Sequence, residues 1–178
     1  MNRVLIFIAG LVIIGLAGAT GAYIYTKSHS PEASDKLSTD AMRLSVAYSS
    51  PSIKGRKIFG EEGEALVPYG KVWRTGANEA TMISFGQDVK IGGKVVPKGE
   101  YSLFTIPTST DWTVILNKER GQWGTSYNQA QDQIRTKALA SDTSESQESL
   151  SLTFSEESYG ADLHIRWATK HIRLPIMK

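Results

Sequence analysis

Alternation of apolar and polar residues with a period of two dominates the chain after residue 41. The apolar members stand at every second position in five runs: Leu44, Val46, Tyr48; Trp112, Val114, Leu116; Leu150, Leu152, Phe154; Leu163, Ile165, Trp167; and Ile172, Leu174, Ile176. Successive side chains of a β-strand point to opposite faces, so each run predicts a half-buried strand. The pattern predicts one mostly β domain over residues 42–178, a single antiparallel β-sandwich or barrel-like fold, rather than a parallel α/β sheet.

Turn residues separate these runs. Gly92-Gly93 stands between two short apolar runs and predicts a two-residue hairpin turn. Residues 127–139 fit either a short helix or a loop that enters a strand near Ile134. Residues 141–149 are rich in serine and acidic residues and predict a solvated loop.

The first part of the chain has a different pattern. Residues 4–25 contain no charged residue and cover about 22 positions, roughly 33 Å as a helix, which is enough to cross a bilayer core. Arg3 precedes this segment and favours a cytoplasmic N-terminus. Residues 1–27 therefore predict either an uncleaved signal anchor or a signal peptide cleaved after Ala19 or Ala22.

Both alternatives deliver the β domain to the same compartment. The expected location is the inner membrane, single-pass, with the C-terminal domain in the periplasm; after cleavage the protein would instead be secreted or periplasmic. Residues 28–41 are polar, contain one proline and lack apolar periodicity, so they predict a flexible tether between the membrane and the domain.

Composition excludes several classes of function. The chain has no cysteine, which rules out disulfides, thiolate metal sites, a thiol nucleophile and a lipid-modified cysteine. It carries 20 Lys and Arg against 18 Asp and Glu, so its formal charge of +2 gives no support for nucleic-acid binding.

Residues 66–81, LVPYGKVWRTGANEAT, hold the densest cluster of candidate chemistry. The segment combines two aromatic residues with an arginine, an asparagine and a glutamate between glycines: Tyr69, Trp73, Arg74, Asn78 and Glu79. The planar guanidinium of Arg74 suits a carboxylate or a phosphate, and Glu79 could act as a base or pair with Arg74. The alternatives are a structural loop pinned by an Arg74–Glu79 ion pair, a ligand-binding site, and a catalytic centre.

Two other segments carry candidate ligand-binding residues. Lys54 and Arg56 follow a serine-rich stretch and flank a glycine, which fits either an anion pocket or a solvated bend between strands. Trp123 stands beside a glycine and fits either the wall of a cleft or a plug in the core. We expect Lys54, Arg56, Tyr69, Trp73, Arg74, Asn78, Glu79 and Trp123 to line one shared region, where Lys54 and Arg74 hold an anion.

No residues are assigned to catalysis, to a metal or to a cofactor. His29 lies in the polar segment, whereas His164 and His171 are seven residues apart, without the spacing of a ligand pair, so we expect a solvent-facing role. The chain lacks a GxSxG elbow, a P-loop and a dinucleotide-binding glycine motif.

Several segments together resemble a known family. The segments SPSIKGRKIFG, LVPYGKVWRTGANEAT, GEYSLFTIP, WTVILNK and QWG are similar to the domain of unknown function 2911, over about residues 42–178. The resemblance implies a bacterial envelope or secreted protein, and it makes residues 52–56 and 69–79 the signature positions. It implies no reaction.

These observations lead to three hypotheses about function. The first is a membrane-tethered, extracytoplasmic β domain that acts as a binding or interaction module, held to the membrane by residues 4–25, with an unknown ligand. The second is an accessory subunit of a membrane protein complex. The third is an envelope hydrolase that uses Glu79 together with Arg74 and Lys54.

Overall fold

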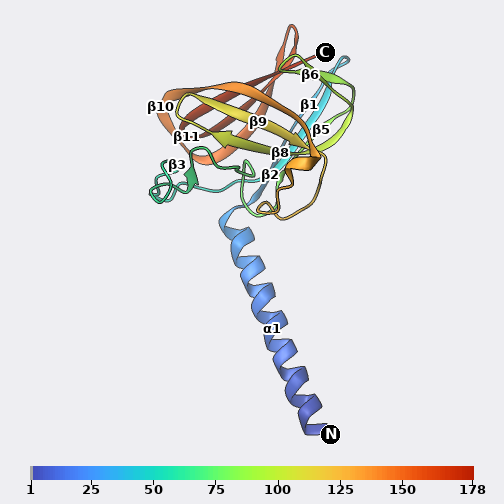
Figure 1. The fold of residues 1–178 in the computed structure, drawn as a ribbon, viewed down its shortest axis with the longest axis vertical. Coiled ribbons are helices and arrows are strands. Elements are labelled where there is room, and N and C mark those ends of the chain that lie inside the picture. The colour runs from blue at the N-terminus through green and yellow to red at the C-terminus, as the bar shows by residue number, and fades with distance from the viewer. Residues whose placement is uncertain (1) are drawn as a thin grey trace.

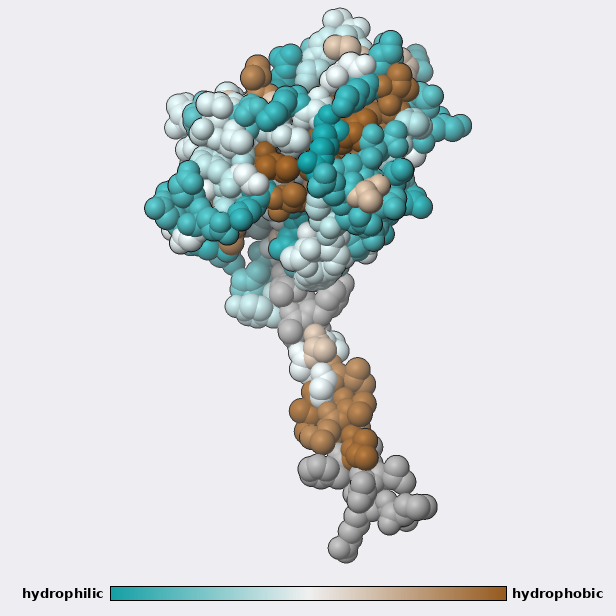
Figure 2. All heavy atoms as spheres, viewed as in Figure 1, coloured by the Kyte–Doolittle hydropathy of each residue, from teal (hydrophilic) through white to brown (hydrophobic). Residues whose placement is uncertain are grey.

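A computed structural model describes residues 2–178; within the N-terminal helix it describes the side chains of residues 8, 11–21, 25 and 27–29. This helix, α1 (Asn2–His29), projects away from the β domain (Figure 1). Its described aliphatic side chains are exposed and form an apolar surface (Figure 2). The predicted membrane segment 4–25 lies partly outside the described side chains. Within the described part of the chain, no helix offers the length of apolar surface that crossing a bilayer requires.

The rest of the chain is mostly β-structure, which confirms the predicted class. Its strands are β1 (Glu32–Ser38), β2 (Arg43–Ser49), β3 (Phe59–Gly60), β4 (Val67–Pro68), β5 (Thr81–Phe85), β6 (Val89–Ile91), β7 (Lys94–Val96), β8 (Gly99–Pro107), β9 (Asp111–Asn117), β10 (Asp132–Glu157) and β11 (Gly160–Met177). Nine strands form one antiparallel sheet in the order β1-β2-β5-β8-β9-β10-β11-β6-β7, which does not close into a barrel. The short strands β3 and β4 pair separately and in parallel.

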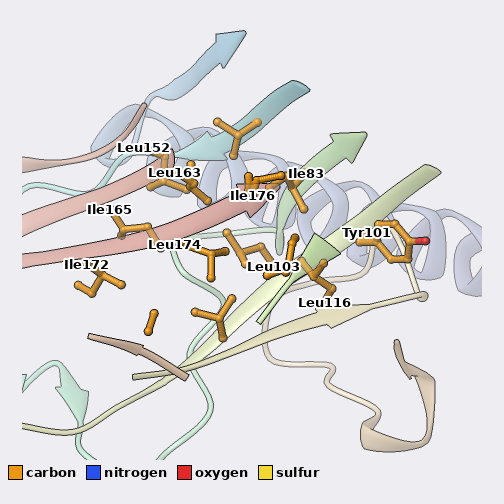
Figure 3. Packing of buried hydrophobic residues seen from close by; sticks show 14 of the residues in the cluster. Ile83, Tyr101, Leu103, Leu116, Leu152, Leu163, Ile165, Ile172, Leu174 and Ile176 are labelled. Carbon is orange, nitrogen blue, oxygen red and sulfur yellow. The ribbon is translucent and has the colours of Figure 1, made fainter. Parts of the chain in front are cut away.

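The long strand β10 belongs to both halves of the large sheet. Its residues 132–139 pair with β9, and its residues 140–157 pair with β11, and each of the two pairings contains register shifts. Apolar side chains from β5, β8 and β9 therefore meet those from β10 and β11 in one core, as Ile83, Leu103, Leu152 and Leu163 show (Figure 3). The alternating burial that the sequence predicts is seen in β5, whereas β8 and β9 are buried on both faces, since Phe104 and Ile115 form a second small cluster with Ala80.

The segment 28–41 is not the flexible tether that the sequence predicts. Residues 32–38 form the edge strand β1, which pairs along its whole length with β2. Every second residue of β1 is half-buried, and Leu37 packs against the core. The polar composition concealed a period-two pattern with a single large apolar residue, so the prediction was wrong there.

Two other local expectations are resolved by the structure. Residues 141–149 continue the strand β10 instead of forming a loop, although most of their side chains are exposed. Of the two alternatives for residues 127–139, the short helix is limited to one 3-10 turn at Gln129–Gln131, and the strand begins at Asp132. The hairpin at Gly92-Gly93 is confirmed: both glycines have positive φ and join β6 to β7.

Candidate functional site

A pocket of about 270 Å³ lies where α1 meets the β domain. Three parts of the chain enclose it: the end of α1 with Ser30, the segment 51–56 after β2, and the segment 66–77; Trp167 of β11 adds an aromatic wall. Four of the predicted binding residues line this one pocket, namely Lys54, Arg56, Trp73 and Arg74. The β scaffold thus brings together two sequence segments about 20 residues apart.

Trp73 fixes the position of the signature segment. Its backbone forms an isolated bridge with Thr105 of β8, with N···O distances of 2.7 and 2.8 Å in the two directions. Its indole is buried, donates a hydrogen bond to the carbonyl of Gly76 at 3.1 Å, and stacks on Trp167 with ring centroids 5.7 Å apart. The backbone is therefore fixed immediately before Arg74.

Arg74 is half-buried and lines both this pocket and a neighbouring cavity beside Gly124. Its Nη1 donates a hydrogen bond to the backbone carbonyl of Asn78 at 3.3 Å. Among the described residues no carboxylate lies within ion-pair distance of it. Burial lowers the pKa of Arg74, which is the cost of taking a cation from water without supplying an anion. An arginine nevertheless stays protonated, so the pocket contains an uncompensated positive charge.

Gly124 makes room for the stem of this arginine. A Cβ at residue 124 would lie 2.0 Å from Arg74 Cδ and 2.8 Å from Arg74 Cβ. The amide of Gly124 also donates to the carbonyl of Asn78 at 3.0 Å, the same oxygen that accepts from Arg74. The loop between β9 and β10 therefore sets where the guanidinium lies.

Lys54 and Arg56 stand at the rim of the pocket and are exposed. Lys54 adopts a φ of 48°, and its amide donates to Glu148 Oε1 at 3.0 Å, which fixes the turn. The guanidinium of Arg56 donates to the carbonyls of Ile53 and Ser52, at 3.0 and 2.5 Å. Both side chains are outside the ion pairs formed by the described residues. Three cations therefore face one small pocket.

A family model described as "Protein of unknown function (DUF2911)" matches residues 30–176, and so covers this pocket and the whole β domain. The chain belongs to the DUF2911 family. No curated protein and no solved structure matches the chain. The family match begins at residue 30, within the segment that the sequence assigns to the tether, in agreement with the observed strand β1.

The remaining predicted residues of this DUF2911 domain lie outside the pocket. Tyr69 is half-buried and lines a neighbouring cavity of about 380 Å³, which Arg56 also borders. Asn78 is buried with a φ of 58°, and its Nδ2 donates to Ser49 Oγ at 3.3 Å, so its role is to hold the loop. Trp123 is 42% exposed. The pocket thus brings together four of the eight predicted residues, and the other four lie elsewhere.

Glu79 faces a different cavity, of about 620 Å³, and pairs with Lys27 at the end of α1. The Nζ–Oε2 distance is 2.8 Å, so the Arg74–Glu79 ion pair that the sequence allowed is absent. Burial is the largest single influence and raises the pKa of Glu79, but the hydrogen bond from Lys27, a backbone hydrogen bond and the positive charge of Lys27 together outweigh it and hold that pKa below its usual value. A carboxylate clamped in this way is a poor general base.

Sequence reasoning missed the contribution of distant segments to the pocket. Ser30 and His29 reach it because α1 ends there, and Trp167 reaches it because β11 passes beneath Trp73. Tryptophan at an alternating strand position predicted burial but gave no signal of its partner. Likewise, His164 and His171 are not simply solvent-facing: a bend at Ala168, with a φ of 52°, brings His164 Nδ1 to 2.9 Å from His171 Nε2. Within the described residues, no group of three acidic or histidine side chains is arranged to hold a metal ion.

Proposed function

We propose that this DUF2911 protein is a membrane-tethered binding module that takes a small anionic ligand in the pocket at Arg74. The observation that carries the proposal is the half-buried guanidinium, which donates to one backbone carbonyl and has no carboxylate partner among the described residues. A guanidinium has five N–H donors in a rigid fork. A bound carboxylate or phosphate would accept hydrogen bonds from the guanidinium N–H groups that do not donate to the Asn78 carbonyl, and it would neutralise the positive charge of Arg74.

The walls of the pocket narrow the class of ligand. Its volume of about 270 Å³ lies just below the usual range of about 300–1,000 Å³ for small-molecule sites. Trp73 and Trp167 provide aromatic surface on one side, while Lys54 and Arg56 provide positive charge at the rim. The expected ligand therefore combines one phosphate or carboxylate group with a small flat or apolar body.

The N-terminal helix supports a membrane-bound location for this module. We infer that residues 4–25 anchor the protein in the inner membrane, with the domain folded as a β-sandwich in the periplasm, or target it for secretion if the segment is cleaved. The uncharged sequence and the exposed aliphatic side chains of Leu11, Val12, Ile13 and Ile14 support this inference. Exposed apolar surface of this kind is stable in contact with lipid rather than water.

The third hypothesis, a hydrolase based on Glu79, receives no support from the geometry. Glu79 and Arg74 face different cavities, and Glu79 is paired with Lys27. The proposed binding function therefore assigns Glu79 to the attachment of α1 and gives it no role in the pocket.

Calorimetric titration of the full-length protein in detergent tests the proposal. The probes are inorganic phosphate, phenyl phosphate and benzoate, and tryptophan emission reports the pocket through Trp73 and Trp167. We expect phenyl phosphate or benzoate to bind more tightly than inorganic phosphate, and Arg74→Gln to weaken binding at least tenfold. Arg120→Gln is the matched control, since Arg120 is exposed and pairs with Glu100. The absence of binding by all three probes, or equal loss in both variants, would overturn the proposal.

A further inference from the structure

The pocket lies very near the place where the predicted membrane segment ends. That segment ends at Tyr25, and His29 lines the pocket four residues later along the same helix. At about 1.5 Å per residue the rise between them is roughly 6 Å. The polar headgroup region on each side of a bilayer is about 5–8 Å thick. A span that ends at Tyr25 therefore places His29, and with it this wall of the pocket, at the level of the lipid headgroups.

The surface around the pocket combines exposed apolar side chains with cations. Leu66 and Val72 are 49% and 40% exposed, and both line a shallow groove with Arg74 and Gly124. Trp123, 42% exposed, is the residue before Gly124. Tryptophan is enriched at membrane–water interfaces, and exposed aliphatic residues beside it add favourable contact with lipid.

The net charge of this surface is positive. Residues 54–74 contain five Lys and Arg against three Glu. Two of the three glutamates, Glu62 and Glu64, are already paired with Lys71 and Lys57. Lys54, Arg56 and Arg74 are left as the cations of the segment that face the pocket. Cations in this position attract the anionic lipids of a membrane surface.

We propose that the anion taken by the pocket is the phosphate-bearing headgroup of an anionic phospholipid in the membrane that holds α1. This inference rests on the proposed function, because it names the class of its ligand. Arg74 donates to the phosphate from within the pocket, Lys54 and Arg56 contact it from the rim, and Leu66, Val72 and Trp123 lie in the interfacial layer. The protein then contacts the bilayer at two places, at α1 and at this surface.

Lipid nanodiscs that carry the full-length protein provide the test. One set contains phosphatidylcholine alone, and a second replaces a rising fraction of it with phosphatidylglycerol. A small fraction of lipid bearing a nitroxide on its headgroup quenches tryptophan that lies in the interface. We expect quenching to rise with the phosphatidylglycerol fraction and to return to the phosphatidylcholine level at high salt, because exposed charges are then screened.

Removing two charges near the pocket, and two elsewhere, distinguishes a local lipid-binding site from general electrostatic attraction to the membrane. The double variant Lys54→Gln, Arg56→Gln is expected to weaken the apparent affinity for phosphatidylglycerol by up to roughly 30-fold, since each cation near such a surface contributes about fivefold. The control is Lys90→Gln, Lys98→Gln, which removes the same charge at β6 and just after β7; Figure 1 places β6 at the end of the domain remote from α1. Equal effects of the two double variants would overturn the inference.

Soluble glycerol phosphate distinguishes a lipid headgroup from a free anion. Displacement of the phosphatidylglycerol-dependent quenching by glycerol phosphate supports a headgroup in the pocket. If the soluble probes bind but quenching does not depend on the phosphatidylglycerol fraction, the lipid inference is rejected. The proposed anion-binding function is retained in that case. Failure of the soluble probes and of phosphatidylglycerol alike would reject both.

Discussion

The substitution Gly124→Ala perturbs the pocket without removing a charge from it. The added Cβ would lie 2.0 Å from Cδ, 2.8 Å from Cβ and 2.9 Å from Cγ of Arg74. Carbon atoms in ordinary contact are about 3.5–4.0 Å apart, so Cδ has to move by about 1.5 Å or more. The guanidinium is bonded to Cδ and moves with it, which breaks the 3.3 Å hydrogen bond to the carbonyl of Asn78.

Two consequences of this displacement can be measured separately. Overpacking at one site costs about 1–3 kcal/mol of unfolding free energy, which urea denaturation detects. The loss of a positioned hydrogen bond from a charged group to the ligand costs about 1.5–3 kcal/mol, or roughly 10- to 150-fold in Kd. Calorimetric titration with phenyl phosphate measures the second quantity in variants that remain folded.

Gly121→Ala is the control in the same loop. A Cβ at residue 121 meets nothing within 4 Å, although its φ of 71° makes the substitution mildly strained. It should cost about 1 kcal/mol of stability and leave the Kd unchanged. Full affinity in folded Gly124→Ala, alongside loss of affinity in Arg74→Gln, would refute the reasoning, because the position of the guanidinium would then not matter.

Three further predictions concern stability. Replacement of the buried, stacked Trp73 by alanine should lower the free energy of unfolding by about 3–5 kcal/mol in urea denaturation. Asn117→Ala should lower the free energy of unfolding by about 1–3 kcal/mol in the same assay, because the fully buried side-chain amide donates hydrogen bonds through Nδ2 and accepts one through Oδ1. An unchanged free energy of unfolding would mean that water replaces the amide. Burial, and then Arg166, lower the pKa of both His164 and His171 below the usual 6.5. The unfolded chain therefore binds more protons than the folded one, so the free energy of unfolding should fall as the pH falls below about 6.5. The double variant His164→Gln, His171→Gln should reduce this dependence of the unfolding free energy on pH.

The period-two pattern was sufficient to predict most of the β domain. Strands such as β5, β9 and β11 carry large apolar residues at alternate positions, and no other local structure buries that pattern. The pattern failed where burial was partial. β1 has one large apolar residue, Leu37, and the middle of β10 is exposed. The sequence pattern therefore predicted a flexible tether for β1 and a loop for the middle of β10. Their strand structure depends on hydrogen bonds to neighbouring strands, which a local pattern does not reveal.

The sequence pointed to four of the residues that line the pocket but not to the other segments that enclose it. Residue types identified Lys54, Arg56, Trp73 and Arg74, because cations and aromatics beside glycines are the groups that an anion pocket needs. Tyr69 and Glu79 have the same character and lie nearby in sequence, yet they face other cavities. The direction of each side chain depends on positive φ angles at Thr75 and Asn78 and on the bridge from Trp73 to β8. Such tertiary constraints leave no periodic signal in the sequence.

The energetics of Arg74 favour the proposed anion-binding role of the pocket. A domain selected for stability alone would pair a half-buried guanidinium with a carboxylate or replace it with an apolar side chain, since either change avoids the cost of desolvation. Glu79, five residues along the chain, is held instead by Lys27 at the base of α1. The bridge from Trp73 fixes the backbone just before Arg74, and Gly124 leaves room for the arginine stem. The cation is therefore kept at a cost to the stability of the domain, and under the proposed function an anion bound in the pocket recovers that cost as binding energy.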